Sequence, residues 1–337
     1  MKKILYYVTD HGLGHATRSV AIIRKLLEEQ IEVTVRSSNL NYFNKSLPDT
    51  NIISGITDVG PVIEENTISI NKNKTLEKMG KWIDSIHEIS KNEQDIISKI
   101  NPNLILSDIS AMPFIAAHKA QIDSIGISNF SWIDVLRGFP NNQIQLLEEA
   151  YDLSTMAIQL PFGLPMKPFK NKKQVGLVCK TPTNSRIQLR KKLGLKDSEI
   201  CVFINLGKYF SIRPKVSKNI KIISTGAKIY SNNVMYINPW IEGQDLIFAS
   251  DLVISKCGYG IISECLTNGI PFLYISDNDH LEQKAISDKL SRIGLQNRIL
   301  EENLNDLVFD EESISQIKTK IEKNETQTVI DLIKEIL

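Results

Sequence analysis

The sequence lacks the features that would mark a disulfide-stapled, membrane-spanning or nucleic-acid-binding protein. Its four cysteines show no Cys-x-x-Cys spacing, which favours buried reduced thiols and argues against a disulfide framework. No apolar run approaches the roughly 20 residues that are needed to span a bilayer. The formal net charge is only +1, so no whole-molecule field supports nucleic acid as a partner.

The N-terminal residues are not expected to act as a secretory signal. Met1-Lys2-Lys3 precedes an apolar run, Ile4–Val8, that is too short for a signal-peptide core and breaks at Thr9-Asp10. The expected location is therefore the cytoplasm, and a peripheral contact with a membrane face is left open.

What is present is an ordinary globular composition, with 42% hydrophobic and 23% charged residues over 337 positions. That length suits two domains of roughly 150 residues each. Ile4–Val8 is expected to form a buried strand, Ala16–Glu29 a helix and Ile31–Val35 a second strand. This strand–helix–strand order is how a doubly wound α/β domain begins.

A second strand–helix alternation follows a stretch rich in proline and lysine. In the first alternation, apolar residues at helical spacing from Thr75 to Ile100 predict one long helix, and in the second Val234–Ile237 is among the predicted strands. The predicted fold class is α/β, with two Rossmann-like doubly wound domains facing across a cleft. The expected organisation is an N-terminal acceptor-side domain over 1–160, a linker over 161–182, a C-terminal donor domain over 183–320, and a C-terminal helix over 321–337 that is considered as packing back on the N-terminal domain.

The most informative stretch is Ser255–Pro271. Asp251–Ile254 predicts a buried strand and the residues after the turn predict a helix, so Gly258 and Gly260 fall at a strand-to-helix turn. Glycines there let main-chain N–H groups approach an anion, and the helix dipole favours negative charge by roughly 0.3–1 kcal/mol. Glu264, placed on the first helical turn, would reach the ribose beside a phosphate. The alternative is a plain turn whose glycines only permit tight packing.

A glycine loop, His11-Gly12-Leu13-Gly14-His15-Ala16-Thr17-Arg18, directly follows the first strand. Ligands of open α/β sheets bind beyond the carboxyl ends of strands, so the loop is well placed for binding. The loop does not match the Gly-x-Gly-x-x-Gly fingerprint of dinucleotide-binding proteins, because another residue stands at the position of the third glycine. The second predicted strand also leads into Arg36-Ser37-Ser38 where an acidic residue is required. A hydride-transfer enzyme is therefore disfavoured.

Three side chains near this loop are candidates for chemistry. His15, at a helix start that should keep it neutral, can accept a proton from a hydroxyl, or it caps the helix or packs against the other domain. Arg18 either faces a phosphate or solvates the helix. Asp108, at the end of another strand, either orients an acceptor hydroxyl or caps the helix that follows.

The second half offers two further polar loops. Gly207-Lys208 follows the first strand of that half and either wraps a diphosphate or forms a bare turn. Asp277–Gln283 places amide and carboxylate groups just past a strand, which suits sugar hydroxyls, although an exposed capping segment is the alternative. No spacing in either half is dedicated to metal ligands, so no metal site is expected.

At these residues the chain resembles the GT-B superfamily of glycosyltransferases, in particular the MurG-like, family-28-type nucleotide-sugar transferases. Gly12-Leu13-Gly14-His15 with Arg18 looks like the N-terminal glycine loop of that group, and it matches the Gly-x-Gly-His-x-x-Arg motif of a related nucleotide-sugar hydrolase. Ser255–Pro271 and the pair Glu282-Gln283 look like the donor site of the C-terminal domain.

The chain is also similar to the transferase-like N-terminal region of L-arabinokinase-type proteins. The similarity is carried by Ser107-Asp108, Ser128-Asn129-Phe130-Ser131-Trp132 and Lys256-Cys257-Gly258-Tyr259-Gly260. Together the two resemblances cover nearly the whole chain.

The resemblance implies an inverting, metal-independent transferase of hexosyl or N-acetylhexosaminyl groups that needs no cofactor. The donor would be a nucleoside-diphosphate sugar, UDP-linked by expectation, and the acceptor an unknown sugar, lipid or small molecule. His15 would be the general base, with Asp108 as the second catalytic residue. The nucleotide-sugar-binding residues would be Gly12, Gly14, Arg18, Gly207, Lys256, Gly258, Tyr259, Gly260, Glu264, Glu282 and Gln283.

Two other functions stay open at this point. In a nucleotide-sugar hydrolase, His15 would activate water instead of an acceptor hydroxyl. A catalytically silent module would bind the nucleotide sugar without turnover. Asn278-Asp279-His280 precedes Glu282-Gln283 in the donor loop and departs from the family pattern, so the sugar is not identified.

Overall fold

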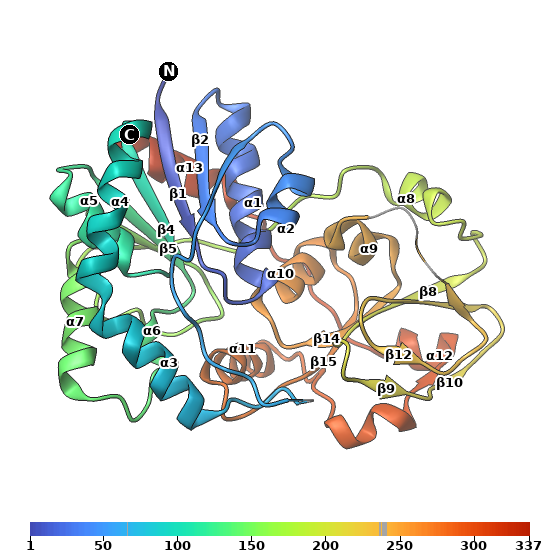
Figure 1. The fold of residues 1–337 in the computed structure, drawn as a ribbon. Coiled ribbons are helices and arrows are strands. Elements are labelled where there is room, and N and C mark those ends of the chain that lie inside the picture. The colour runs from blue at the N-terminus through green and yellow to red at the C-terminus, as the bar shows by residue number, and fades with distance from the viewer. Residues whose placement is uncertain (66, 236, 238–240) are drawn as a thin grey trace. The chain divides into compact units, whose positions relative to one another are not determined.

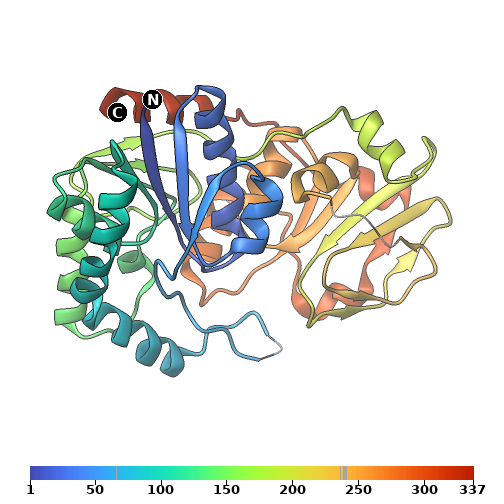
Figure 2. The ribbon, with the colours of Figure 1, turned by 45° about the horizontal axis from the view of Figure 1, so that its top comes forward.

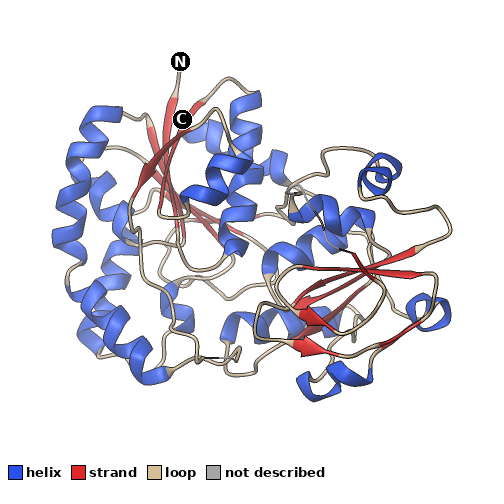
Figure 3. Cartoon of the chain, turned by 45° about the vertical axis from the view of Figure 1, so that its right-hand side comes forward, coloured by secondary structure: helices blue, strands red, loops and turns tan. Residues whose placement is uncertain are grey.

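The computed structural model describes residues 1–65, 67–235, 237 and 241–337. The chain forms two compact units, and each is built on a parallel β-sheet flanked by helices (Figure 1, Figure 3). The N-terminal unit comprises Met1–Glu64, Ile70–Cys179 and Asn324–Leu337, and the C-terminal unit comprises Glu65–Ser69 and Lys180–Lys323.

The N-terminal unit is organised around a seven-stranded sheet in the order β3-β2-β1-β4-β5-β6-β7, with every pairing parallel. The strands are β1 (Lys3–Val8), β2 (Glu32–Ser37), β3 (Asn51–Ser54), β4 (Leu104–Asp108), β5 (Ser124–Ser128), β6 (Met156–Gln159) and β7 (Lys172–Gln174). The strand order reverses between β1 and β4. Loops that leave the two strands at this switch point run in opposite directions, which leaves room for a ligand at the carboxyl edge.

Helices cover both faces of this sheet (Figure 1). They are α1 (Leu13–Glu28), α2 (Leu40–Ser46), α3 (Lys72–Asp84), α4 (Ile86–Ile100), α5 (Met112–Lys119), α6 (Trp132–Val135), α7 (Asn141–Asp152) and α13 (Thr326–Ile336). Leu5 and Tyr7 of β1 share one core with residues of α3, α4, α5 and α7. Helix α1 also contacts β1 and β2.

The last helix, α13, belongs to the N-terminal unit and packs against α1 (Figure 2). Its buried residues Val329, Ile330 and Ile333 recur at helical spacing on one face. At its end Lys334 Nζ lies 2.9 Å from Glu29 Oε2, just past the C-terminus of α1. The last residues of the chain therefore complete the cover of the N-terminal sheet.

The C-terminal unit has a five-stranded parallel sheet in the order β13-β11-β8-β14-β15, and its switch point lies between β8 and β14. The strands of this unit are β8 (Ile200–Asn205), β9 (Ser211–Ile212), β10 (Lys215–Val216), β11 (Ile220–Ser224), β12 (Lys228–Ile229), β13 (Val234–Met235), β14 (Leu252–Lys256), β15 (Phe272–Ile275) and β16 (Val308–Phe309). The short strands β9 and β12 pair with each other, as do β10 and β16.

The helices of the C-terminal unit are α8 (Arg186–Lys192), α9 (Gly243–Ala249), α10 (Tyr259–Asn268), α11 (Leu281–Arg292), the 3₁₀ helix η1 (Glu301–Asp306) and α12 (Glu311–Ser315). Helix α9 packs against both α8 and α10. Among the described residues no helix combines the length and the apolar character that crossing a membrane requires.

The structure differs from the sequence-based expectations at three places. The long helix expected from Thr75 to Ile100 is two helices, because the hydroxyl of Ser85 turns back to the carbonyl oxygens of Lys81 and Trp82 at 3.0 Å and the chain breaks there. Only Val234–Met235 of the strand expected over Val234–Ile237 is assigned, and Tyr236 lies outside the described residues.

The third difference concerns the linker expected over 161–182. Its residues up to Cys179 belong to the N-terminal unit, and Lys172–Gln174 forms the edge strand of the sheet. Met166 and Phe169 are buried in the core of that unit. Their burial holds this segment against the domain, although its prolines and lysines had predicted a linker between domains.

Candidate functional site

His15, Arg18 and Asp108 meet at the carboxyl edge of the N-terminal sheet. His15 and Arg18 lie on the first turns of α1, and Asp108 is the last residue of β4. The Nδ1 atom of His15 is 2.7 Å from Oδ1 of Asp108. Arg18 donates to both oxygens of the same carboxylate, from Nε at 2.7 Å and from Nη2 at 2.5 Å. All three side chains are buried, so the group is a desolvated ion pair with a histidine attached.

The surrounding hydrogen bonds indicate which nitrogen of His15 carries the proton. Nη2 of Arg18 lies 2.6 Å from His15 Nδ1, but its two hydrogens are accounted for by Asp108 and by Ser128 Oγ at 3.1 Å. Nη1 of Arg18 donates to Asn129 Oδ1 at 2.6 Å. Nδ1 of His15 is then the donor to Asp108, which leaves Nε2 with the lone pair that a general base needs.

The charge on Asp108 is set by its neighbours. Burial by itself raises the pKa of this carboxyl, but the charges of Arg18 and His15 and their hydrogen bonds bring the pKa down to about 2. Ser19 Oγ donates a further hydrogen bond to Oδ2 at 3.1 Å. Asp108 is therefore ionised at neutral pH and stabilises positive charge that develops on the imidazole.

The residue after Asp108 has a strained backbone. Ile109 has a φ of 66°, in the left-handed region that β-branched residues avoid, and such a residue costs roughly 1–3 kcal/mol. The surroundings hold this turn in place: the Tyr151 hydroxyl donates to the Ile109 carbonyl at 2.7 Å, and the amide of Ser110 donates to the Asp108 carbonyl at 3.0 Å. Strain at a strand end that carries a buried carboxylate points to a functional position.

The N-terminus of α1 is open. Gly12 precedes the helix with a φ of 77°, and no side chain caps the first turn. A Cβ atom placed on Gly12 or Gly14 would meet nothing within 4 Å. The first turn of α1 thus has no cap from its N-cap residue and is uncrowded at Gly12 and Gly14, which suits a site for an anion or an oxyanion.

Two expectations for this unit do not match the geometry. Arg18 is 1% exposed, and its guanidinium is held by Asp108 and Asn129, so it does not present charge to a phosphate. Asp108 makes no cap for α5, whose N-cap has no side-chain hydrogen bond, and at 0% exposure it does not reach an acceptor hydroxyl. It acts on His15 and Arg18 instead.

In the C-terminal unit, two glycine turns and a lysine meet at the carboxyl edge of the sheet. Gly207 follows β8 with a φ of 92°, and Gly226 follows β11 with a φ of 98°. A Cβ on Gly226 would lie 3.0 Å from the carbonyl carbon of Gly207, so the two turns touch. The ammonium of Lys256, the last residue of β14, lies across Gly207, and burial lowers its pKa. This edge of the sheet therefore combines the positive charge of Lys256 with two glycine turns whose main chains lie in contact.

Helix α10 starts at the same edge with a bare N-terminus. Gly258 is its N-cap in extended conformation, makes no side-chain cap, and has open space where a Cβ would be. Tyr259 is only 3% exposed, so its ring packs in the core and does not line a ligand site. Gly260 is buried in the first turn. The amides of this turn are therefore the groups available to a diphosphate.

Glu264 lies on the second turn of α10, one turn further along than the sequence suggested, because the helix starts at Tyr259. Its side chain is 3% exposed, and its Oε1 atom has no hydrogen-bond partner. Burial raises the pKa of Glu264 to about 7. The charge of Lys180 lowers this pKa, and the charges of Glu242 and Asp245 raise it further. An unpaired buried carboxylate oxygen is the kind of group that a bound hydroxyl satisfies.

The loop after β15 contains the remaining predicted residues. Gln283 accepts a hydrogen bond from the Asp277 amide at 3.0 Å, so its side chain braces the loop. Burial raises the pKa of the Cys257 thiol, and the nearby charge of Glu282 raises it further. In the same loop Asp277 Oδ2 and His280 Nδ1 are buried without partners. The loop therefore has free polar atoms next to the turn that starts α10.

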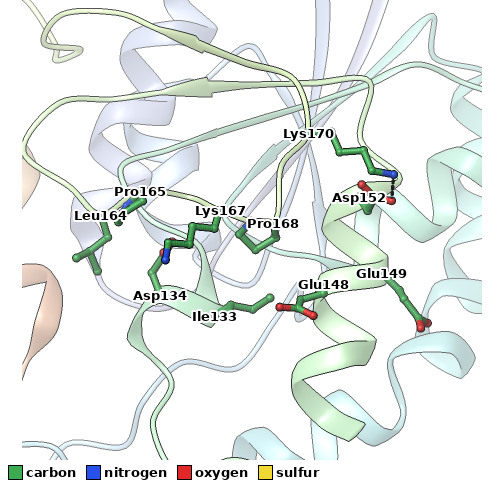
Figure 4. Close-up of a pocket in the computed structure, with 10 residues that line it drawn as sticks. All are labelled: Ile133, Asp134, Glu148, Glu149, Asp152, Leu164, Pro165, Lys167, Pro168 and Lys170. Carbon is green, nitrogen blue, oxygen red and sulfur yellow. Dashed lines mark hydrogen bonds and ion pairs between the residues drawn. The ribbon is translucent and has the colours of Figure 1, made fainter. Parts of the chain in front are cut away.

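A cavity of about 770 Å³ lies beside α6 and α7 of the N-terminal unit (Figure 4). Its lining residues are Ile133, Asp134, Glu148, Glu149, Asp152, Leu164, Pro165, Lys167, Pro168 and Lys170. None of the predicted catalytic or nucleotide-binding residues lines it. Figure 4 shows Lys170 paired with Asp152 among these residues.

Sequence reasoning missed several residues that build these sites. Gly226 could have been found, since a glycine just past a predicted strand is the same signal that singled out Gly207. Asn129 was noticed as a polar residue after a strand that suits a sugar face, but its contact with Arg18 of α1 could not be predicted. The role of Ile109 depends on a backbone angle, which the sequence does not show.

Comparison with known proteins finds a matching family model in each half of the chain. Residues 2–162 match the model described as "Glycosyl transferase family 1", and residues 189–336 match "Glycosyltransferase family 28 C-terminal domain". The chain is 29% identical over 312 residues to L-arabinokinase from Arabidopsis thaliana. That alignment covers 85% of this chain, and the chain spans 29% of the length of this relative.

Solved structures with the same fold include several glycosyltransferases. The glycosyltransferase SnogD from Streptomyces nogalater aligns over 100% of both chains with a TM-score of 0.60 and 14% identity. MurG from Acinetobacter baumannii aligns over 99% of this chain and 100% of its own, with a TM-score of 0.53 and 14% identity. UGT89C1 from Arabidopsis thaliana, solved with UDP-L-rhamnose, covers 99% of this chain and 93% of its own, with a TM-score of 0.57 and 15% identity.

The buried ion pair predicts a pH-dependent loss of stability in Asp108→Asn. The substitution leaves the guanidinium of Arg18 buried without its counter-ion, which costs about 3–5 kcal/mol at pH 7. Asp108 has a lower pKa in the folded state than in the unfolded state. Its stabilising contribution is therefore present above about pH 4 and is lost as the pH falls towards 2.

Urea unfolding followed by circular dichroism at a series of pH values tests this expectation. The stabilities of the wild type and Asp108→Asn should converge as the pH falls from 4 to 2. Ser19→Ala, which removes one neutral hydrogen bond from the same carboxylate, serves as the control and should run nearly parallel to the wild type. A constant gap between wild type and Asp108→Asn would contradict the assigned charge state.

Proposed function

We propose that the chain is an inverting glycosyltransferase that uses a nucleoside-diphosphate sugar, because its two halves match glycosyltransferase family models and its fold is GT-B. The nucleotide we favour is UDP, and the group transferred is a hexosyl or N-acetylhexosaminyl unit. The N-terminal unit supplies the general base and the C-terminal unit supplies the donor site.

The observation that carries this proposal is the pair formed by His15 and Asp108. Nε2 of His15 takes the proton of an acceptor hydroxyl while that oxygen bonds to the anomeric carbon. The bond from the anomeric carbon to the diphosphate breaks on the opposite face, so the configuration inverts. Asp108 stays ionised, fixes the imidazole in one tautomer and stabilises the imidazolium that forms.

The leaving diphosphate gains negative charge as that bond breaks. The amides of Gly207, Gly258 and the first turn of α10, with the ammonium of Lys256, are the groups we assign to stabilise it. These groups supply positive potential, so the mechanism as proposed needs no metal ion and no cofactor. Glu264 is assigned to the ribose hydroxyls through its unpaired oxygen, and Glu282 with the Asp277–Gln283 loop to the sugar.

The acceptor is proposed to be a hydroxyl compound that binds the N-terminal unit near His15. Open space over Gly12 and Gly14 supports this placement. We propose that the acceptor is a sugar, a lipid or a small molecule, and that the protein acts in the cytoplasm with a peripheral membrane contact as an option.

A second candidate function is hydrolysis of the nucleotide sugar. The motif Gly12-Leu13-Gly14-His15 with Arg18 favours it, and the same geometry would let Nε2 of His15 activate water. One experiment separates the candidates: incubate the protein with a panel of nucleotide sugars and follow diphosphate release with and without acceptors. Release that needs an acceptor supports transfer, release without one supports hydrolysis, and binding without release indicates a silent module.

His15→Ala should lower turnover by about 10²–10⁴-fold and leave nucleotide affinity unchanged, because the nucleotide is assigned to the other unit. The imidazole is the base in this mechanism, and general-base catalysis contributes about 10²–10⁴-fold to rates. His87→Ala, which removes an exposed histidine from α4, is the matched control and should behave as the wild type. Full activity in His15→Ala would remove this residue from the mechanism.

Glu264→Ala should weaken UDP binding by about 1.5–3 kcal/mol, the scale of a hydrogen bond to a charged group. Titration calorimetry at pH 8, where Glu264 is ionised, measures the change. Glu312→Ala, on the exposed surface of α12 in the same unit, is the control and should bind as the wild type does. Equal affinity of Glu264→Ala and Glu312→Ala would reject the ribose assignment.

A further inference from the structure

Asp58 is a buried carboxylate of the N-terminal unit that the mechanism above does not use. It follows β3 in the chain and is 2% exposed. Its Oδ1 accepts a hydrogen bond from the hydroxyl of Thr9, and its Oδ2 accepts one from Trp132 Nε1 at 2.9 Å. Thr9 directly follows β1 and Trp132 starts α6, so one carboxylate ties together the ends of two segments that lie far apart in the sequence.

Both donors contact His11 of the glycine loop. The Thr9 hydroxyl accepts from the amide of His11 at 3.2 Å. The Trp132 ring meets the His11 ring edge-on, with centroids 5.7 Å apart and an angle of 72°. The His11 ring also lies against Gly60, where an added Cβ would come within 2.2 Å of the imidazole. The place of His11 is therefore specified by three neighbours.

The contact extends to His15 through one more ring. Phe130 packs edge-on against Trp132 with centroids 5.6 Å apart, and edge-on against His15 at 5.7 Å. Both histidine rings of the loop therefore rest on the pair Phe130–Trp132, and Asp58 fixes the indole of that pair.

We propose that Asp58 is a positioning residue: its carboxylate fixes Thr9 and Trp132, and through them it holds the His11 ring in place and His15 in the orientation in which it serves the reaction. The kinetic consequence rests on the proposed function. The side-chain linkage does not, and it can be measured without turnover.

The linkage depends on pH because both partners of Asp58 are donors. Burial raises the pKa of Asp58 to about 6, the hydrogen bonds from Thr9 and Trp132 and the charge of His15 oppose that rise, and Asp10 adds to it. Tyr151 also lies close to Asp58. A threonine hydroxyl can reverse and accept from a protonated carboxyl, but an indole N–H cannot accept. Protonation therefore weakens the contact of Asp58 with its neighbours as the pH falls through about 6.

The indole N–H signal of Trp132 in two-dimensional ¹H–¹⁵N NMR reports on this contact. The chain has three tryptophans, and Trp132→Phe assigns the signal by deleting it. In the wild type the signal should shift with pH with a midpoint near 6. It should still titrate in His15→Ala, since the charge that changes is on Asp58. A signal that does not move between pH 4.5 and 8 would overturn the proposal.

Three variants sharpen the NMR measurement. In Asp58→Asn the titration of the indole signal should vanish. In Thr9→Val, which keeps the carboxylate but removes one donor to it, the midpoint should move to higher pH. Asp134→Asn alters a carboxylate on the same short helix that bonds Ser131 instead of the indole, and it should leave the midpoint unchanged. An unchanged midpoint in Thr9→Val, or a persisting titration in Asp58→Asn, would contradict the assignment.

Kinetics test the second part of the proposal. Asp58→Asn should lower kcat at pH 7.5 by about 10- to 100-fold, the cost of a small misplacement of catalytic groups, with the KM for the donor unchanged. Thr9→Val should show a smaller loss in the same direction. An unchanged kcat in a folded Asp58→Asn would show that Asp58 is structural only. If the wild type turns over no nucleotide sugar at all, the proposed function fails while the NMR result stands by itself.

Discussion

The buried ion pair between Arg18 and Asp108 is the interaction on which the N-terminal site depends. Two charges survive at this depth only when their geometry is good and the remaining hydrogen-bonding positions are filled. Here Arg18 donates hydrogen bonds to the Asp108 carboxylate from two nitrogens. Ser19 and His15 add further hydrogen bonds to the same two oxygens. Because Arg18 and His15 sit three residues apart on α1, the contact that neutralises Asp108 also fixes the imidazole.

Both units place their polar groups by the same rule of sheet topology. In the N-terminal unit the switch point lies between β1 and β4, whose ends carry the Gly12 loop and Asp108. In the C-terminal unit it lies between β8 and β14, whose ends carry Gly207 and Gly258. In each unit a helix starts there without a side-chain cap, so its first amides are available to a ligand.

The sequence was sufficient for the parts that follow from local pattern. Glycine turns after apolar runs located the loops of both units, and the spacing of apolar residues located most helices. What it could not supply were contacts between distant segments. Arg18 was expected to face a phosphate or to solvate the helix, because nothing local shows that it pairs with Asp108, 90 residues away. Asp58 left no trace for the same reason, since its partners lie 49 and 74 residues away.

The tautomer of His15 tests the account most directly. If Asp108 accepts a proton-bearing Nδ1, then Nε2 is the free base on which the chemistry depends. In ¹⁵N NMR of the folded protein at pH 8, the account predicts that Nδ1 of His15 is protonated and that Nε2 is not. A hydrogen on Nε2, with Nδ1 accepting from Arg18 instead, would contradict it, because no lone pair would then face an incoming hydroxyl.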